Sequence, residues 1–438
     1  MRRSARMDAF EAATSQMGRL ISPRGGPICK LSERRAWRDG LAIADYITQI
    51  GFGEMAHHSP DPTGGGSVAK SRALLAAAGE ALERYCLSLC PVEGLSFSIV
   101  EENFGACYSL DDLKWFIDQQ YSTPGFPFEP PRADTPFAWI PGFSLLRTSE
   151  VSVPASLVYL PYRLRAGEQA TSWQTSAGTS CMDCPDEAAV RAVLELVERE
   201  ALTICWESRC PFPPVNAEQL ADVCAEFAFH RSPIMIKAFD LTTDIGIPVV
   251  LAIAFATGRG PALAIGTAAE LCAEHALKKA VEEACTSWRS VTYLYRDQGS
   301  MPDDLMARME AGARSSDHSV YYAYPQNRHH FDFLLSSPLV PRVLCSTARH
   351  STTRLATIAD LLKAAHQEVV LIDVTSTEIA DHGLFVVRAV SPTLVRPTLG
   401  RQARHLRNPR IREIPMKLGY VDDIPTTASL YQNAHPFP

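Results

Sequence analysis

Glutamates recur at helical spacing in a segment that starts with small and hydroxyl residues, between Thr175 and Glu200. At about 100° per residue, Glu187, Glu195 and Glu198 fall within about 80° of one another around the helix axis. The apolar residues form a separate stripe: Val190, Val193, Leu194, Val197, Ala201 and Ile204. One acidic face alone is most often simply solvated, although carboxylates grouped in this way also suit a metal ion.

The arrangement occurs twice more, which favours a shared site over three solvated faces. Glu80 and Glu83 lie three residues apart in segment 73–86, with Arg84 directly after them. Lys279 and Glu283 lie one helical turn apart in segment 276–288. We expect the inner faces to contain Leu74, Ala78, Leu82, Tyr85 and Leu89 in the first segment and Leu277, Val281, Ala284 and Trp288 in the second.

Each acidic segment follows a short stretch rich in glycine and hydroxyl residues: 64–67, 176–180 and 266–267. We expect loops here, because glycine-rich loops let backbone amides approach an anion. Carboxylates on rigid helices suit Mg²⁺, which proteins usually hold with few carboxylates and phosphate oxygens. The two features together predict a nucleotide–Mg²⁺ site. The sequence contains no Gly-x-x-x-x-Gly-Lys-Ser/Thr run, so this is not a P-loop enzyme.

The three segments, in this order, resemble the YcaO family, whose members bind ATP with an unusual set of glutamates. Gly79-Glu80-Ala-Leu-Glu83-Arg84 is similar to the first family motif, the run from Glu187 to Arg199 to the second, and Lys279 with Glu283 to the third. The resemblance extends from about Gly64 to the last residue. It implies an α+β fold, with helices and strands mixed, in which mixed β-sheets pack with the long helices that carry the glutamates.

The resemblance also implies a role for each motif residue. The Mg²⁺ ligands, or partners of ribose and phosphate, are Glu80, Glu83, Glu187, Glu195, Glu198 and Glu283. Ser180, Asp183, Arg84 and Lys279 contact the nucleotide. Arg199 and Lys279 contact phosphates or orient the glutamates, and the expected catalytic residues are Glu195, Glu198, Arg199 and Pro438.

The tail Asn433-Ala-His-Pro-Phe-Pro438 has two interpretations. Chain ends are ordinarily disordered. Azole-forming YcaO proteins, however, often finish in Pro-x-Pro-x-Pro, and this tail resembles that motif with Ala434 at the first proline. The resemblance implies that the tail enters the active site and that the carboxylate of Pro438 lies near the reacting amide.

The activity implied by the resemblance is ATP- and Mg²⁺-dependent cyclodehydration of Cys, Ser or Thr in a ribosomally made precursor peptide, giving thiazolines or oxazolines. The implied partners are the precursor, a separate E1-like or leader-binding subunit, an FMN-dependent dehydrogenase and a second copy within a larger complex. We expect the separate subunit because the chain has no obvious room for a fused leader-binding domain. Two alternatives stay open, namely thioamide or amidine formation and a non-catalytic scaffold.

Composition sets the remaining expectations. The 438 residues carry a net charge of −7, with 46% hydrophobic and 21% charged residues, as in an ordinary globular protein. The mild acidity argues against a nucleic-acid partner, and the absence of a signal-like or membrane-spanning run predicts a cytoplasmic protein. We expect reduced cysteines, and a zinc site at Cys181-x-x-Cys184 would need a second pair.

We expect one catalytic domain over residues 1–438. It comprises an N-terminal part (1–63), an ATP-binding core (64–411) and a C-terminal tail (412–438). Strands are expected at 156–160, 248–255, 369–374 and 384–390, where β-branched residues cluster. The central helix should begin at Pro185 with Asp183 as its N-cap. An exposed aromatic segment is expected around 321–331.

Overall fold

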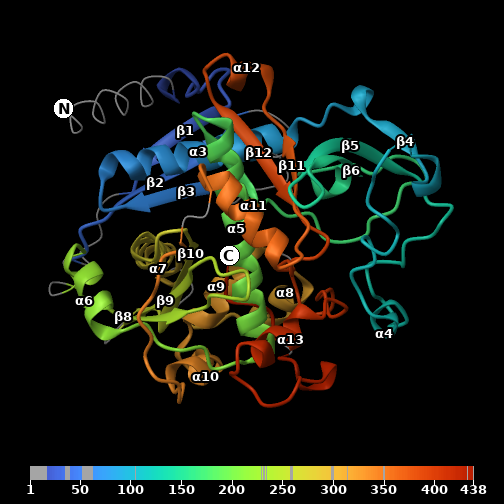
Figure 1. The fold of residues 1–438 in the computed structure, drawn as a ribbon. Coiled ribbons are helices and arrows are strands. Elements are labelled where there is room, and N and C mark those ends of the chain that lie inside the picture. The colour runs from blue at the N-terminus through green and yellow to red at the C-terminus, as the bar shows by residue number, and fades with distance from the viewer. Residues whose placement is uncertain are drawn as a thin grey trace.

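Three antiparallel sheets and a set of helices make up the described part of the chain (Figure 1). The computed structural model describes residues 17–34, 40–51, 63–103, 105–227, 229, 232, 234–256, 260–296, 300–312, 314–348, 351–431 and 433–437. One sheet joins β1 (Ile28–Glu33), β2 (Ala44–Ile50) and β3 (Thr63–Ser67), and a second joins β8 (Ile234–Asp240), β9 (Val249–Ala256) and β10 (Leu263–Ala269). The third has the order β4 (Ser96–Ser98), β5 (Phe137–Ser144), β11 (Val370–Asp373), β12 (Phe385–Val390) and β7 (Thr179–Met182), with β6 (Ser149–Pro154) also paired to β5.

The long helices are the three that carry the acidic segments: α3 (Lys70–Ser88), α5 (Pro185–Ser208) and α7 (Ala273–Arg296). The shorter helices are α4 (Asp118–Tyr121), α6 (Ala217–Ala225), α8 (Leu305–Ala311), α9 (Ser315–Ala323), α10 (Asp332–Leu335), α11 (Arg354–Ala364), α12 (Thr377–Ala380) and α13 (Arg410–Lys417). Short 3₁₀ turns lie at Val92–Gly94, Val100–Glu102, Ala155–Leu157, Pro325–Phe331 and Thr427–Ser429. The predicted α+β class is confirmed. The boundary expected at residue 63 falls inside the first sheet, because β1 and β2 pair with β3.

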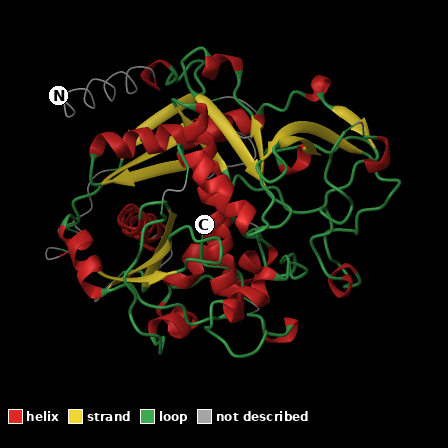
Figure 2. Cartoon of the chain, in the orientation of Figure 1, coloured by secondary structure: helices red, strands yellow, loops and turns green. Residues whose placement is uncertain are grey.

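Helix α5 runs through the middle of the molecule and separates the six-stranded sheet from the β8–β10 sheet (Figure 2). The reason can be followed in β9, which is apolar on both faces. Val249, Leu251 and Ile253 pack into the core that contains α5, whereas Val250 and Ala252 pack against α7. Alternation with period two therefore sends successive side chains into two cores.

The sequence predicted loops at the glycine-rich stretches. In the structure these stretches belong largely to strands. Gly65 lies in β3 and Gly266 in β10. A Cβ atom at Gly65 would lie 2.6 Å from the backbone nitrogen of Ala77, and one at Gly266 would lie 2.1 Å from that of Ala284. These glycines let α3 and α7 approach their strands closely.

That close approach changes which residues of α3 face inward. Ala73 and Ala77 are fully buried, whereas Leu74 and Tyr85 are half-buried and Leu89 is 38% exposed. The inner face predicted for α3 is thus only partly right, because small residues occupy the contact with the glycine strand. The inner face predicted for α7 is confirmed, since Leu277, Val281, Ala284 and Trp288 are all buried.

Other local predictions have mixed outcomes. The strands expected at 248–255, 369–374 and 384–390 form as β9, β11 and β12, but residues 156–160 follow β6 as a turn. Helix α5 does begin at Pro185, yet its N-cap is Cys184 and not Asp183. The segment 321–331 is not an exposed aromatic surface, because Tyr321, Tyr322, Tyr324 and Phe331 are buried in the core that also contains α5.

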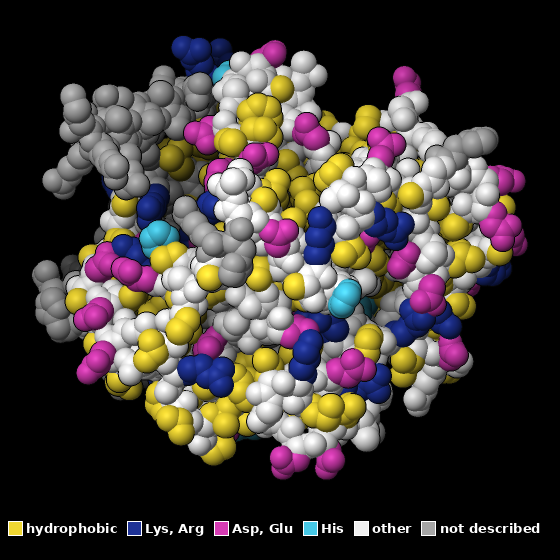
Figure 3. Space-filling model, viewed as in Figure 1, with side chains coloured by type: hydrophobic (Ala, Val, Ile, Leu, Met, Phe, Trp, Pro, Cys, Tyr) yellow, Lys and Arg dark blue, Asp and Glu magenta, His cyan; other side chains and the backbone are white. Residues whose placement is uncertain are grey.

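No disulfide joins the twelve cysteines, all of which lie in the described ranges. The helices within the described ranges include none that is both long and apolar enough to cross a membrane. Lys and Arg side chains alternate with Asp and Glu over the face shown in Figure 3. His57 and His58 lie outside the described residues.

Candidate active site

Helices α3, α5 and α7 bring five of the predicted glutamates together. Arg199 lies among them and joins two of the carboxylates. Its Nη2 is 3.4 Å from Glu195 Oε1 and its Nη1 is 3.0 Å from Glu198 Oε1. The charges of Glu80, Glu83, Glu195, Glu198 and Glu283 act on one another across this space. We call these five residues the glutamate cluster.

Main-chain amides hold four glutamates of the cluster. Each amide comes from a strand, or the turn before it, that lies beside the helix carrying the glutamate. The donor–acceptor pairs are Gly64 N to Glu80 (3.0 Å), Cys181 N to Glu83 (2.8 Å), Gly178 N to Glu195 (3.0 Å) and Thr267 N to Glu283 (2.6 Å). The hydroxyl of Thr267 donates to Glu198 at 2.6 Å. The glycine and hydroxyl stretches therefore orient the glutamates, and these amides are not free for an anion as the sequence suggested.

The cluster is short of positive charge. Burial raises the pKa of Glu83 to about 8, and the neighbouring Glu195 raises it further than burial alone would. Burial likewise raises the pKa of Glu283 to about 8, and repulsion from the charge of Glu198 raises it further. Carboxylates that are crowded and desolvated in this way are stabilised by a cation.

The residues present fit a divalent cation by their chemistry. Within the described ranges, no three His, Cys, Asp or Glu side chains are arranged to hold a metal ion as they stand, since the carboxylates face amides and Arg199. Hard oxygen donors on three rigid helices are nevertheless the donor set that Mg²⁺ takes, together with phosphate oxygens. The candidate ligands among them are Glu80, Glu83, Glu195, Glu198 and Glu283.

A second charged group, which the sequence did not indicate as a unit, lies beside the cluster. Glu270, only 2% exposed at the end of β10, accepts from three cations. Lys279 Nζ is 2.5 Å from its Oε1 and Arg354 Nη2 is 3.2 Å from its Oε2, and Arg191 Nη1 contacts the same carboxylate. Burial alone would raise the pKa of Glu270, but Lys279 and Arg191 lower it below its ordinary value.

Two predicted residues are tied to this second group. Glu187 Oε2 lies 2.5 Å from Arg354 Nη1, so Arg354 bridges Glu187 and Glu270. Lys279 contacts Glu270 and is 45% exposed on its side chain. Arg191 has a signal in the sequence, because it follows Glu187 by one helical turn. Glu270 and Arg354 have none, since each is a single charged residue at the end of an element.

The remaining predicted contacts lie at the edge of the site. Arg84 Nη2 is 3.6 Å from Glu80 Oε1. Ser180 is buried within β7, opposite Val387 of β12. Asp183 is exposed in the turn between β7 and α5. The roles of these three residues toward a nucleotide stay predictions.

Arg388 of β12 supports the turn that orients Glu195. This arginine is 1% exposed and donates to the carbonyl oxygens of Thr175 (2.7 Å) and Ala177 (2.6 Å) and to the Thr179 hydroxyl (2.9 Å). Burial lowers the pKa of Arg388 to about 9. Burying a guanidinium is costly unless its N–H groups find acceptors, and the oxygens of this turn supply them.

The C-terminal tail reaches this site. The ring of Phe437 lies over the guanidinium of Arg199, with 3.6 Å between Cζ and the ring centroid. Phe437 is 7% exposed and Ala434 2%. Residues 433–437 are thus packed against the site. Pro438 lies outside the described residues, so its expected position near the reacting amide stays a prediction.

These features define an α+β protein whose three long helices line one site with glutamates. The family model described as "YcaO cyclodehydratase, ATP- and Mg²⁺-binding" matches residues 64–395. The chain belongs to the YcaO family, as its motifs predicted. ATP and Mg²⁺ are accordingly its cofactors.

Curated relatives match part of the chain. A protein from Rhizobium leguminosarum bv. trifolii, named for its place in the tfuA 3′ region, is 34% identical over 127 residues, which cover 27% of this chain and 29% of that protein. A protein from Methanothermobacter thermautotrophicus is 29% identical over 154 residues, which cover 34% of this chain and 40% of that protein. The chain therefore spans well under half the length of these relatives.

Solved structures share the fold. A heterocyclase in complex with substrate and cofactor has a TM-score of 0.79 at 21% identity, covering 98% of this chain and 57% of that one. YcaO from Methanopyrus kandleri, bound with AMPPCP and Mg²⁺, has a TM-score of 0.59 at 18% identity over 88% of this chain and 90% of that one. A chain of the E. coli microcin synthetase McbBCD complex with pro-MccB17 has a TM-score of 0.64 at 14% identity over 96% and 98%.

Proposed function

We propose that this chain catalyses ATP- and Mg²⁺-dependent cyclodehydration of Cys, Ser or Thr residues in a ribosomally made precursor peptide, which gives thiazolines or oxazolines. The observation that carries the proposal is the convergence of five glutamates from three helices, each positioned by a neighbouring strand, in a chain of the YcaO cyclodehydratase family.

The reaction needs a good leaving group. The thiol or hydroxyl of the peptide attacks the preceding carbonyl carbon, and the resulting oxyanion attacks the γ-phosphorus of ATP. Loss of inorganic phosphate then forms the C=N bond of the ring, so ATP and peptide give ADP, phosphate and azoline. Bound ATP and Mg²⁺ supply the phosphoryl group and neutralise its charge.

The protein's contribution in this proposal is positioning and electrostatics. The cluster would hold the Mg²⁺ ions, with Glu187 once it leaves Arg354. Arg199 orients Glu195 and Glu198 through its N–H groups. Lys279, Arg191 and Arg354 offer a net positive charge beside the cluster, where the phosphate groups would lie.

We further propose that the chain works with other proteins. The McbBCD neighbour is a multisubunit synthetase with its precursor bound, and the heterocyclase neighbour holds a substrate. By analogy, an E1-like or leader-binding subunit delivers the precursor, an FMN-dependent dehydrogenase oxidises azolines, and two copies of this chain pair within the complex. A cytoplasmic location remains a prediction from the sequence.

The test is co-expression of the chain with a candidate precursor and its leader-binding partner, followed by mass spectrometry. Each ring removes one water from the precursor. Rings that appear only when chain, ATP and partner are all present support the proposal. A precursor of unchanged mass, with ATP bound normally by calorimetry, would instead favour a scaffold, and a gain of sulfur would favour thioamide formation.

A further inference from the structure

Five arginines of the described chain are buried, and one of them differs from the rest. The other four each donate to a carbonyl or carboxylate oxygen: Arg289, Arg388, Arg404 and Arg410. Arg396, which follows β12 and is 7% exposed, contacts no oxygen acceptor in any of the described ranges. A buried guanidinium without an acceptor is energetically costly, so its presence in a folded protein calls for an explanation.

The ring of Trp115 lies beside this guanidinium. Arg396 Cζ is 5.3 Å from the ring centroid, which makes a cation–π contact. The aromatic face attracts the charge, but it does not replace an oxygen acceptor for the five N–H groups of a guanidinium. The guanidinium nitrogens also keep some contact with solvent, since they are not among the polar atoms that the fold closes off. A small ligand can therefore reach them.

A second unpaired group lies against the same indole. His405 is 4% exposed and stacks on Trp115, with 5.1 Å between the ring centroids. Neither ring nitrogen of His405 has a hydrogen-bond partner among the residues that the structure describes. Burial, and then the charge of Arg396, hold the pKa of His405 well below its ordinary value, so the ring is neutral at pH 7 and carries one N–H. Arg396 and His405 thus both lack an oxygen acceptor.

The described surroundings supply no negative charge for Arg396. Burial lowers the pKa of Arg396 to about 10, and the one acidic group that acts on it is the phenol of Tyr108. Burial holds the pKa of that phenol well above its ordinary value, and its hydroxyl donates to the carbonyl oxygen of Val390 at 3.4 Å. At pH 7 this part of the described chain therefore has one positive charge and no anion to balance it.

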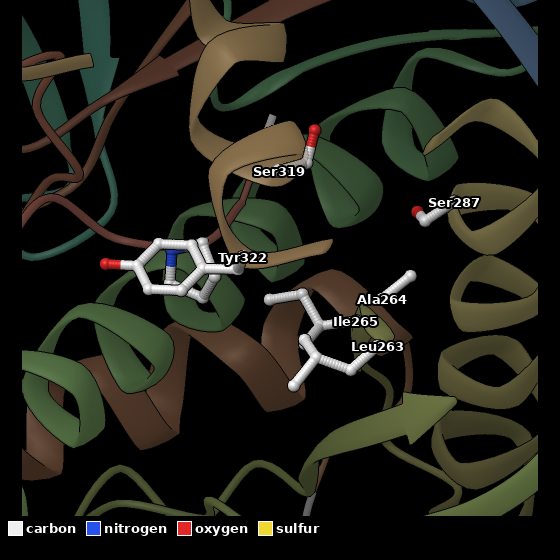
Figure 4. Close-up of a pocket in the computed structure, with 7 residues that line it drawn as sticks. Leu263, Ala264, Ile265, Ser287, Ser319 and Tyr322 are labelled. Carbon is white, nitrogen blue, oxygen red and sulfur yellow. The ribbon is translucent and has the colours of Figure 1, made fainter. Parts of the chain in front are cut away.

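A cavity elsewhere in the fold has a different character. It lies between β10 and α9 beside Pro436, and Figure 4 shows Leu263, Ile265 and Tyr322 around it. Its volume of about 10 Å³ has room for about one water molecule, and its described lining residues are all uncharged. The candidate site for an anion is thus the unpaired charge at Arg396.

Arg396 also lies near the turn that orients Glu195. Its charge acts on Arg388, and burial together with this repulsion lowers the pKa of Arg388 to about 9. Arg388 in turn donates to the carbonyl oxygens of Thr175 and Ala177 in that turn. An anion bound at Arg396 would offset the repulsion between the two arginines.

We propose that Arg396, with Trp115 and His405 beside it, binds a carboxylate. A carboxylate brings one negative charge and two oxygens, which match the single charge and the planar fork of Arg396. A phosphate dianion would instead leave a net negative charge in desolvated surroundings. The carboxylate belongs either to a free small acid or to an acidic side chain of a peptide. The site is independent of ATP and of the proposed reaction.

Thermal unfolding of the full chain in acetate tests the site. Sodium acetate is titrated at pH 7 against sodium chloride of equal ionic strength. We expect a saturable rise in Tm of about 1–3 °C at roughly ten to a hundred times the half-saturating concentration. Arg396→Met should abolish the rise. Lys279→Gln, which removes a half-exposed cation of the second charged group, should retain it. An equal rise in wild type and Arg396→Met would mean an adventitious ion only and would overturn the proposal.

Stability in chloride gives a second readout. Arg396→Met keeps an unbranched side chain against Trp115 and removes the unpaired charge, so its midpoint of urea unfolding should exceed that of wild type. Arg410→Met is the matched control and should lower the midpoint, because Arg410 is paired with Glu200 and Asp244. A lower midpoint for Arg396→Met would show that the fold itself uses this charge, which contradicts a site kept for a ligand.

The contribution of His405 is measured in the same titration. His405→Phe keeps a ring against Trp115 but removes the N–H, so the half-saturating acetate concentration should rise about three- to tenfold. An unchanged value would exclude His405 from the site.

Short peptides distinguish the two sources of the carboxylate. Acetyl-Gly-Glu-Gly-amide, its Gln counterpart and inorganic phosphate are titrated beside acetate. Half-saturation by the Glu peptide at a concentration at least tenfold below that of acetate assigns the site to an acidic side chain, and any higher value assigns it to a free acid. Equal responses to the Glu and Gln peptides, or tighter binding of phosphate than of acetate, would overturn the assignment to a carboxylate.

Discussion

At the scale of single residues, the site is a set of carboxylates held in place by hydrogen bonds. Glu195 accepts from the amides of Gly178 and Thr179 through one oxygen and from Arg199 through the other. A glutamine would keep an acceptor oxygen but lose the charge. Substitutions of this kind therefore separate the charge of the cluster from its role in the fold.

Glu195→Gln and Glu198→Gln should each abolish ring formation and leave the fold intact. Loss of one carboxylate charge around the phosphates should lower kcat/KM at least a hundredfold, or about 2.7 kcal/mol. Ring number by mass spectrometry and thermal unfolding are measured together. Glu218→Gln, on the exposed face of α6, is the control, and near-normal activity at either cluster position would place these residues on a solvated face.

Nucleotide binding should depend on Mg²⁺, because the cluster presents several carboxylates to a polyanion. Without the metal, like charges oppose binding. We expect the affinity for ATP, measured by calorimetry, to fall at least tenfold in EDTA, whereas adenosine is affected little. The same ATP affinity with and without Mg²⁺ would mean that the nucleotide does not meet this cluster.

At the scale of elements, each long helix is paired with a strand that supplies amides to its glutamates. The pairing depends on a glycine where helix and strand touch. In β10, Gly266 lies against Ala280 and Ala284 of α7, and Thr267 beside it holds Glu283 and Glu198. Sequence, packing and site geometry meet at this contact.

Gly266→Ala should destabilise the protein by about 3 kcal/mol, because the added Cβ would lie 2.1 Å from the backbone of α7. The midpoint of urea unfolding measures the loss. Gly94→Ala is the matched control, since a Cβ there meets nothing within 4 Å. If both variants unfold at the wild-type urea concentration, the helix does not depend on that glycine for its position.

At the scale of the whole molecule, α5 connects all the parts of the site. Its first turns contact the second charged group, its middle carries Glu195 to Arg199, and its last turns meet the tail through Trp206. Helix α9 faces it across the tail and contributes His318, which is buried. The stability of this arrangement should therefore depend on pH.

Burial lowers the pKa of His318 to about 4 from an ordinary value near 6.5. Because the pKa of His318 is lower in the folded protein, the unfolded chain binds more protons between about pH 4 and 6.5. The free energy of unfolding is therefore at its full value above about pH 6.5 and decreases as the pH falls toward 4. The loss should be about 3 kcal/mol for this group. Urea unfolding at several pH values measures it.

His318→Gln should flatten that pH dependence in the same interval, while His275→Gln, on the exposed face of α7, should not. Identical slopes for wild type and His318→Gln would show that His318 does not titrate between the folded and unfolded states as described.

The sequence by itself determined the parts that are local in the chain. The apolar stripes and the spacing of Glu195 and Glu198 follow from helical periodicity, so α5 and its acidic face could be predicted. The strand at 248–255 could be predicted as well, because a run rich in β-branched residues and bounded by turns is typical of a strand. The order of the three motifs along the chain was then enough to predict the family, which the family model confirms.

Only the tertiary structure decided which residues meet. Glu270 and Arg354 are ordinary single charges in the sequence. They form an ion pair because β10 ends beside the start of α11. From the sequence, the glycine stretches could serve either to bind an anion or to let a helix approach a strand. The structure shows the close approach of helix and strand. Phe437 lies over Arg199 although the two residues are 238 positions apart in the chain. Local periodicity cannot predict such contacts, because they arise from the path of the whole chain.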